Sequence, residues 1–260
     1  MYYFTIGAVF KNESHILKEW IDHYFFHGID HIYLINDNSN DNFLEILQPY
    51  IDKNIITLYN APIYNYNGGA WPQTEYYNTY FLQHLAQTKW FGIFDLDEFL
   101  YSPNKLDLKQ HLKVLEDKQQ LQINWVHFGS SSFKEQPKNV VQNFLYRGEY
   151  NSIRNGPSGR YNSYKSIINC NYSNRFIQLG IHRHIKPNII DTNISFELDM
   201  PIMLVNHYAI QSVEAWNNRS KTSSVGNHYP GFIRDINLFN KLDINDIYDD
   251  RLKLQNDNIV

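Results

Sequence analysis

The chain has 260 residues, of which 43% are hydrophobic, and this length suits one large domain with a sizeable core. Its formal net charge of -4 removes the broad electrostatic attraction that nucleic acid or an anionic membrane needs, so neither is expected as a main partner. Cys170 is the sole cysteine, which excludes an intrachain disulfide and favours a cytoplasmic setting. Neither a signal peptide nor a run of membrane-spanning length is recognisable, so any membrane association is expected to be peripheral.

Short apolar runs alternate with helical patterns through the first hundred residues, which is typical of β-α-β units and a parallel sheet. The expected strands are residues 2–10, 31–35, 55–59 and 90–94, and the expected helices are residues 13–27, 41–51 and 73–87. Gly28 should end the first helix, and Asp41 is placed to cap the second. Residues 60–71 form a loop long enough to face a substrate.

The second half of the chain is less regular and has no clear domain linker. We expect a helix near residues 106–118 and a strand at 121–128. The whole pattern predicts one catalytic domain over residues 1–240, with a nucleotide-binding half of about 1–100 and an acceptor-side half of about 101–240. Residues 241–260 are expected to be a C-terminal extension that is ordered in part.

Two acidic residues, Asp95 and Asp97, directly follow the buried strand at 90–94. Ligands of open α/β sheets bind at the carboxyl ends of the strands, so this position is where a site is expected. A turn brings both carboxylates to one side, where their oxygens can coordinate Mg²⁺ or Mn²⁺. The remaining coordination positions of the ion can then bind a nucleotide diphosphate. Taken alone, the pair is more readily a solvated acidic turn, and the surrounding order of elements favours the metal site.

Two polar loops fall on the same sheet edge as this pair. Asn12 and Glu13 follow the first strand, and residues 36–41 follow the second. Asp37 is suited to accept a hydrogen bond from a base or a ribose hydroxyl, and Asn12 or Glu13 to line the same nucleoside pocket. An Asx turn with a helix cap is the competing interpretation of residues 36–41.

Taken in chain order, these pieces resemble the glycosyltransferase-A (GT-A) superfamily, and within it families 2 and 92. The matching segments are Lys11-Asn12-Glu13, Glu19-Trp20, Gly28-Ile29-Asp30, Asn36 to Asp41, Gln73, Trp90, Asp95 to Phe99, Trp125, Phe128 to Ser131, Lys165-Ser166, Asn206-His207-Tyr208 and Ser212-Val213-Glu214. The resemblance implies an α/β, Rossmann-like GT-A fold, in which helices flank a mostly parallel central sheet.

The resemblance also implies a reaction: transfer of a sugar from a nucleotide sugar, with a UDP-sugar as the first expectation, to a glycan or glycoconjugate, as in polysaccharide biosynthesis. It implies inversion at the anomeric centre and a divalent cofactor, Mn²⁺ or Mg²⁺, held by Asp95, Asp97 and His207. For His207 a structural role is an equal alternative. The expected donor-binding residues are Asn12, Glu13, Asp37, Gln73, Asp95, Lys165, Arg219 and Lys221.

The catalytic base is left unassigned, because none of the weak candidates Glu135, Glu149 and Glu214 has a spacing that distinguishes it. Aromatic residues of the loop at 60–71, such as Tyr64 and Trp71, suit stacking on a sugar as well as core packing. Two other functions stay open: a metal-dependent nucleotidyl or phosphoryl transferase and a catalytically silent glycan-binding relative. Against the first, the chain has no glycine-rich phosphate loop. Against the second, a silent relative would have no need of the metal-binding residues.

Overall fold

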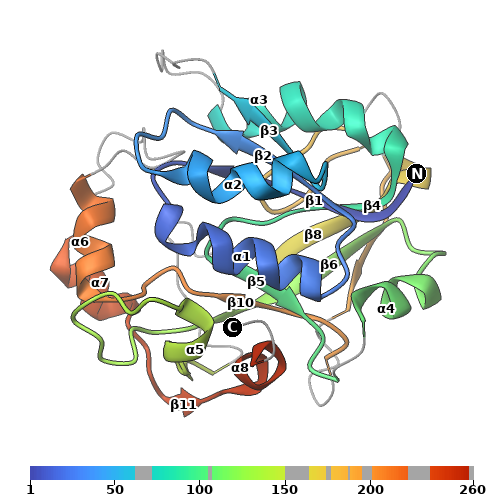
Figure 1. The fold of residues 1–260 in the computed structure, drawn as a ribbon. Coiled ribbons are helices and arrows are strands. Elements are labelled where there is room, and N and C mark those ends of the chain that lie inside the picture. The colour runs from blue at the N-terminus through green and yellow to red at the C-terminus, as the bar shows by residue number, and fades with distance from the viewer. Residues whose placement is uncertain are drawn as a thin grey trace.

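The computed structural model describes residues 1–61, 72–104, 107–149, 164–173, 177–186, 188–194, 201–221 and 235–257. In this part of the chain one large sheet runs through the centre, with helices on both of its faces (Figure 1). Its strands are β1 (Tyr2–Phe10), β2 (His31–Asn36), β3 (Ile56–Asn60), β4 (Thr88–Ile93), β5 (Glu98–Tyr101), β6 (Gln120–His127), β8 (Tyr164–Asn169), β9 (Asp191–Asn193) and β10 (Leu204–His207). The predicted α/β fold is confirmed.

The strand order is β3-β2-β1-β4-β8-β6-β10-β5, with β9 paired to β6. Strands β1 to β4 are parallel to their neighbours among themselves, as are β6 with β10 and β6 with β9. Strands β8 and β5 run antiparallel to their partners. The sheet is therefore mostly parallel as predicted. Of its antiparallel strands, β8 lies in the irregular second half, and β5 directly follows the acidic segment.

Both faces of β1 are buried, by different helical segments. Phe4 and Ile6 pack with α1 (Ser14–Phe26), and α2 (Phe43–Asp52) lies beside it on the same face. Val9 packs instead against Tyr77 and Phe81 on the other face. This two-sided burial explains why the strand is a continuous apolar run.

The segment expected as one α-helix at 73–87 forms three short helical segments of different types, so the prediction of a single helix was wrong. It begins as α3 (Pro72–Tyr76), continues as a π-helical turn at Tyr77–Phe81 and ends as a 3₁₀ helix at Leu82–Gln87. The change brings the Phe81 ring so close to β1 that a Cβ at Gly7 would lie 2.6 Å from it. Only glycine fits at that point of the strand.

Helix ends show one confirmation and one correction. Gly28 follows α1 with a φ of 94°, the left-handed conformation expected of a residue that ends a helix. Asp41 does not cap α2, since no side chain caps that helix; its carboxylate instead accepts a hydrogen bond of 2.8 Å from the amide of Ser14, at the start of α1. The helix expected at 106–118 is shorter, α4 (Leu108–Val114), and Asp107 caps it.

The remaining elements are short: β7 (Tyr146–Arg147), η3 (Cys170–Tyr172), β11 (Ile247–Tyr248), α5 (Val140–Asn143), α6 (Val213–Lys221), α7 (Ile236–Leu242) and α8 (Arg251–Asn256). Strand β11 pairs with β7, and α8 buries Leu252 and Asn256. The side chain of Asn256 contacts His23 and His27 of α1. The segment after residue 240 is thus packed against the rest of the chain as far as residue 257.

Part of the loop predicted to face the substrate, including Tyr64, Tyr66 and Trp71, lies outside the described residues. Among the helices that the structure does describe, none combines the length and the apolar character needed to cross a membrane.

Candidate active site

The acidic segment forms a tight turn between β4 and β5. The Asp95 carbonyl accepts a hydrogen bond of 3.0 Å from the Glu98 amide, and the Glu98 carboxylate accepts one of 2.9 Å from the Asp95 amide. The indole N–H of Trp20, on α1, donates to the carbonyls of both residues at 3.0 Å. The turn therefore has a fixed shape, which fixes the directions of its three carboxylates.

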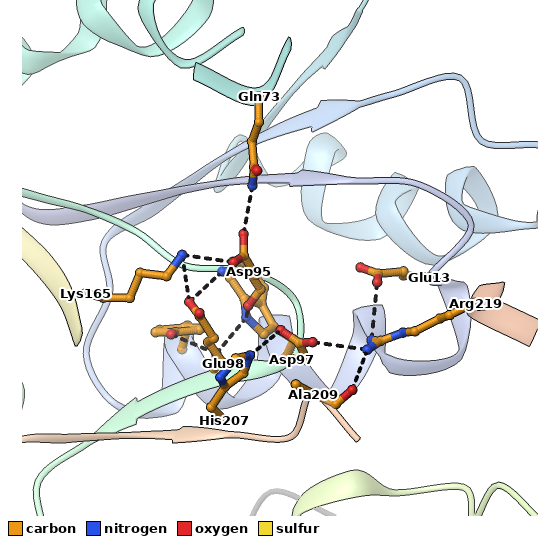
Figure 2. Close-up of polar contacts among 11 residues, drawn as sticks. Glu13, Gln73, Asp95, Asp97, Glu98, Lys165, His207, Ala209 and Arg219 are labelled. Atoms are coloured by element: carbon orange, nitrogen blue, oxygen red, sulfur yellow. Dashed lines mark hydrogen bonds and ion pairs between the residues drawn. The ribbon is translucent and has the colours of Figure 1, made fainter. Parts of the chain in front are cut away.

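Strand pairing places His207 beside this turn. In the antiparallel pair β5–β10, His207 lies opposite Glu98, and Asp97 accepts a backbone hydrogen bond of 2.8 Å from Tyr208. His207 Nε2 lies 3.6 Å from Asp97 Oδ1 (Figure 2). Ligand atoms of Asp97, Glu98 and His207 all lie within 4.8 Å of one another, and two carboxylates with one imidazole suit a cation such as Mn²⁺.

The third member of this group is Glu98, whereas the sequence analysis expected Asp95. Both carboxylate oxygens of Asp95 contact protein donors: Lys165 Nζ at 2.9 Å and Gln73 Nε2 at 3.1 Å. Lys165 also lies 3.1 Å from Glu98 Oε2. The Lys165 ammonium group therefore bridges Asp95 and Glu98.

The charges of this cluster depend on burial. Lys165 and Glu98 are 0% exposed, and Asp95 is 31% exposed. Burial raises the pKa of Glu98, and its neighbours Asp95 and Asp97 add to the rise, although Lys165 opposes it. Burial alone would lower the pKa of Lys165, but the two carboxylates it contacts raise it overall, so Lys165 stays charged.

Asp97 is ionised for a different reason. Burial by itself raises the pKa of this carboxyl, but its contact with His207 and the charges of Arg219 and Lys165 lower it well below its usual range. Arg219 Nη1, on α6, lies 3.2 Å from Asp97 Oδ2. His207 and Arg219 thus contact different oxygens of one carboxylate and approach it from opposite sides in Figure 2.

Arg219 also joins α6 to the loop after β1. Its Nη2 lies 3.4 Å from Glu13 Oε1, and its Nη1 donates to the Ala209 carbonyl at 3.2 Å. Lys221, the other cation predicted here, has a side chain outside the described residues.

A pocket of about 540 Å³ opens on the Arg219 side of Asp97. It lies between the start of α1, the loop at 136–138 and α6, and it is lined by Lys11, Asn12, Glu13, His15, Gln136, Pro137, Lys138, Glu214, Ala215, Asn218 and Arg219. Burial, and next to it the charge of Arg219, lowers the pKa of His15 to about 4, so this ring is neutral at pH 7. The pocket combines three cationic side chains with amides and two carboxylates.

The two polar loops after β1 and β2 hydrogen-bond to each other. Asn12 Oδ1 accepts from the Asn40 amide at 2.8 Å, and Ser39 Oγ accepts from the Asn12 amide at 2.9 Å. The Asn36 side chain accepts from the Ser39 amide, three residues on, at 2.8 Å, which bends the loop locally, but no side chain caps α2. The side-chain oxygen of Asn12 therefore helps to hold the two loops together, and we call this set of hydrogen bonds the loop joint.

The predicted donor-binding residues fall into two groups. Asn12, Glu13 and Arg219 line the pocket. Gln73, Asp95 and Lys165 form a separate hydrogen-bonded chain on the other side of the acidic turn (Figure 2). Asp37 belongs to neither, since its carboxylate accepts from Tyr76 Oη at 3.3 Å and lies 4.0 Å from Lys11 Nζ.

The three candidate bases are all exposed. Glu214 lines the pocket and accepts a hydrogen bond of 2.8 Å from the Gln136 amide. Glu135 and Glu149 do not line it. Sequence reasoning missed Glu98 as a possible ligand, and the available signal was that a third acid directly follows the Asp-x-Asp pair at the start of a strand.

The model of glycosyltransferase family 92 matches residues 2–253. The chain belongs to this family. A family 92 protein of Ricinus communis is 24% identical to it over 229 residues, which are 84% of this chain and 33% of that protein. One of Oryza sativa subsp. japonica is 25% identical over 222 residues, 82% of this chain and 34% of that protein. The chain spans about a third of the length of these curated family 92 relatives, and the family resemblance seen in the sequence is confirmed.

Solved structures similar to this family 92 chain include the S. aureus TarS fragment 1–349 in complex with UDP, with a TM-score of 0.38 and 16% identity over 65% of this chain and 47% of that one. Another is the mannosyltransferase PcManGT from Pyrobaculum calidifontis in complex with GDP-Man and Mn²⁺, with a TM-score of 0.33 and 14% identity over 46% of this chain and 34% of that one. Both similarities are weak.

Proposed function

We propose that this chain is the catalytic domain of a metal-dependent glycosyltransferase that moves a sugar from a nucleotide diphosphate sugar to a glycan or glycoconjugate. The observation that carries the proposal is the group formed by Asp97, Glu98 and His207, whose ligand atoms lie within 4.8 Å of one another beside a partly buried arginine. Membership of glycosyltransferase family 92 supports the reaction class.

The donor set fits a divalent cation. Asp97 is ionised, His207 presents an imidazole nitrogen to the same place, and Glu98 faces His207 across the strand pair. We propose Asp97 and His207 as ligands of Mn²⁺ or Mg²⁺, with Glu98 completing the set in the place that the sequence analysis gave to Asp95. A bound metal ion would stabilise the negative charge of the departing diphosphate.

The protein residues supply the rest of the proposed reaction. The pocket beside Arg219 takes the nucleotide, with a UDP-sugar as the first donor to test, because its cations and amides suit phosphates and a base. Arg219 would exchange its separate contacts with Asp97 and Glu13 for contacts with the diphosphate, because the two terminal nitrogens of a guanidinium can bind two phosphate oxygens at once. Inversion remains part of the proposal, and its base stays unassigned.

The test is hydrolysis and transfer over a panel of UDP-, GDP- and dTDP-sugars with Mn²⁺, Mg²⁺ or EDTA. We expect turnover of at least one donor that EDTA abolishes and that Asp97→Asn reduces strongly. Asp117→Asn is the matched control, because Asp117 is an exposed acid that pairs only with the neighbouring Lys118 among the contacts described for it. If no donor binds or reacts with either metal, the proposal fails. Consumption of a nucleoside triphosphate with a sugar phosphate would instead identify a nucleotidyl transferase.

A further inference from the structure

One face of the sheet carries a row of polar and aromatic residues across neighbouring strands. Strand pairing sets His207 of β10 opposite Glu98 of β5 on one side and opposite His127 of β6 on the other. Trp125 lies two residues before His127 and so shares its face. Polar side chains normally face solvent, whereas these are partly or fully buried, so the row needs another explanation.

The rings of this row touch one another. Trp125 lies 4.4 Å from His207 and 5.5 Å from His127 between ring centroids, and His127 lies 5.3 Å from His207. His182, from the segment after β8, adds a fourth ring 5.1 Å from Trp125. All four side chains are partly exposed. We call Trp125, His127, His182 and His207 the ring cluster.

Nitrogens of the ring cluster lack hydrogen-bond partners among the described residues. In the part of the chain that the structure describes, Trp125 Nε1 and His207 Nδ1 are screened from solvent and contact no acceptor or donor. Glu98 Oε1, in the same row, is also without one. An unmet buried polar group costs about 1–3 kcal/mol, and native proteins rarely gather several of them without a ligand or water.

The position of the ring cluster relates it to the proposed reaction. His207 is shared between the ring cluster and the metal group, and it contacts Asp97 on the side opposite Arg219 and the pocket. If the nucleotide of a donor fills that pocket, the ring cluster lies on the far side of the diphosphate. The ring cluster is then free to bind the group beyond the diphosphate. That is the transferred sugar or the acceptor that receives it.

Resting on the proposed function, we propose that the ring cluster is a pyranose-binding subsite in which the sugar packs a C–H face on Trp125. Aromatic faces suit the apolar face of a sugar ring. The indole N–H donates to a hydroxyl, and a neutral imidazole both donates to and accepts from hydroxyls. Burial lowers the pKa of His182 to about 4, so this ring is neutral at pH 7 and suits an uncharged, hydroxylated ligand.

The experiment compares Trp125→Leu, which removes the aromatic face, with Trp125→Phe, which keeps the face and removes the N–H. Trp90→Phe is the control, because Trp90 is a fully buried tryptophan at the far end of β4 from the acidic turn. Each variant is titrated with UDP and Mn²⁺ and then assayed for hydrolysis of the active donor. Transfer to methyl glucoside, galactoside, mannoside and xyloside is measured in parallel.

We expect all three variants to bind UDP within about twofold of the wild type, since the pocket is not altered. Trp125→Leu should lower transfer to the best glycoside by at least about tenfold, Trp125→Phe by less, and Trp90→Phe hardly at all. A raised KM for the glycoside with unchanged hydrolysis assigns the subsite to the acceptor. An equal loss of hydrolysis and transfer assigns it to the donor sugar.

Two results would separate failure of this inference from failure of the function. If Trp125→Leu binds UDP and transfers as well as Trp90→Phe, the ring cluster is structural and the inference is wrong, while the transferase proposal stands. If the wild type neither binds UDP nor turns over any nucleotide sugar, both proposals fall together.

Discussion

Two polar regions meet at the carboxyl ends of the strands, and they use their polar groups differently. The polar groups of the loops after β1 and β2 hydrogen-bond to each other, as Asn12 does with Ser39 and Asn40. The face around His207 keeps polar atoms without partners in the described part of the chain, among them Trp125 Nε1 and Glu98 Oε1. A satisfied group must lose a bond before it can bind a ligand, whereas an unsatisfied one only gains. The second region is therefore better prepared for a ligand.

The largest effect is expected where the acidic face depends on one buried cation. Lys165→Met should reduce the free energy of unfolding by about 3–5 kcal/mol, because it leaves Asp95 and Glu98 side by side without their shared partner. Urea denaturation followed by circular dichroism measures this.

A double variant sharpens that prediction. Adding Glu98→Gln to Lys165→Met removes one of the two stranded carboxylates, so part of the lost stability should return. Equal stability of Lys165→Met and the wild type would mean that this region does not depend on its charge balance.

The second prediction compares the two regions directly through one carboxylate of each. Asp97→Asn should reduce turnover at least about 100-fold. Mutation of residues that only hydrogen-bond to metal ligands already lowers metal affinity or activity by about 10–100-fold. Asp37→Asn should cost no more than about tenfold, because Asp37 has protein partners in Tyr76 and Lys11. Steady-state kinetics at saturating Mn²⁺ measures both. The reverse order of effects would move the centre of the chemistry to the loops.

The third prediction concerns the loop joint. Asn12 has a φ of 55°, where a Cβ is disfavoured, and its side chain holds Asn40. Asn12→Ala should reduce the free energy of unfolding by about 1–2 kcal/mol, from the lost hydrogen bond and the unfavourable backbone. Asn12→Gly removes the bond without the backbone penalty and should be milder. If both variants keep wild-type stability but lose donor binding, Asn12 is a ligand contact and not a joint.

The sequence could supply the first half of the fold because its strands are long apolar runs separated by amphipathic helices. The breaks at Tyr77–Phe81 and Leu82–Gln87 could not be foreseen, since they depend on how Phe81 fits against Gly7 of a distant strand. The antiparallel strands β5 and β8 depend likewise on pairings between residues far apart in the chain.

The candidate site divides in the same way. The sequence analysis predicted that Asp97 and His207 share a site, and the structure places their side chains 3.6 Å apart, with Arg219 in contact with Asp97. That Glu98 and not Asp95 lies with them could not be predicted, because it depends on Lys165 reaching Asp95 from β8 and on His207 lying opposite Glu98. Trp125 and His127 share a face by simple alternation, and that pattern was readable from the sequence, but its meaning depends on the neighbouring strand.

The smallest effect is expected away from both regions, where α8 meets α1. Asn256 donates to His23 and accepts from His27, and burial lowers the pKa of both rings. The folded state therefore keeps them neutral, while unfolded chains protonate histidine below a pKa of about 6.5. Stability should be complete above that pH and fall as the pH decreases below it.

Urea midpoints between pH 7.5 and 5 test this, and His27→Gln should make the decline shallower because one neutral buried ring is gone. An unchanged slope would show that His27 is protonated to the same extent in the folded and unfolded chains. Turnover measured at fixed pH should differ little between this variant and the wild type.

The pairing of β5 with β10 also limits how chains of this kind can change in length. Glu98 and His207 meet only because of strand register, so residues added to the connections between β5 and β10 leave the pair intact. A single residue inserted within β10 before His207 would turn the imidazole to the other face of the sheet and away from Asp97. Variation in length among related sequences should therefore gather in the connections and avoid Leu204–His207.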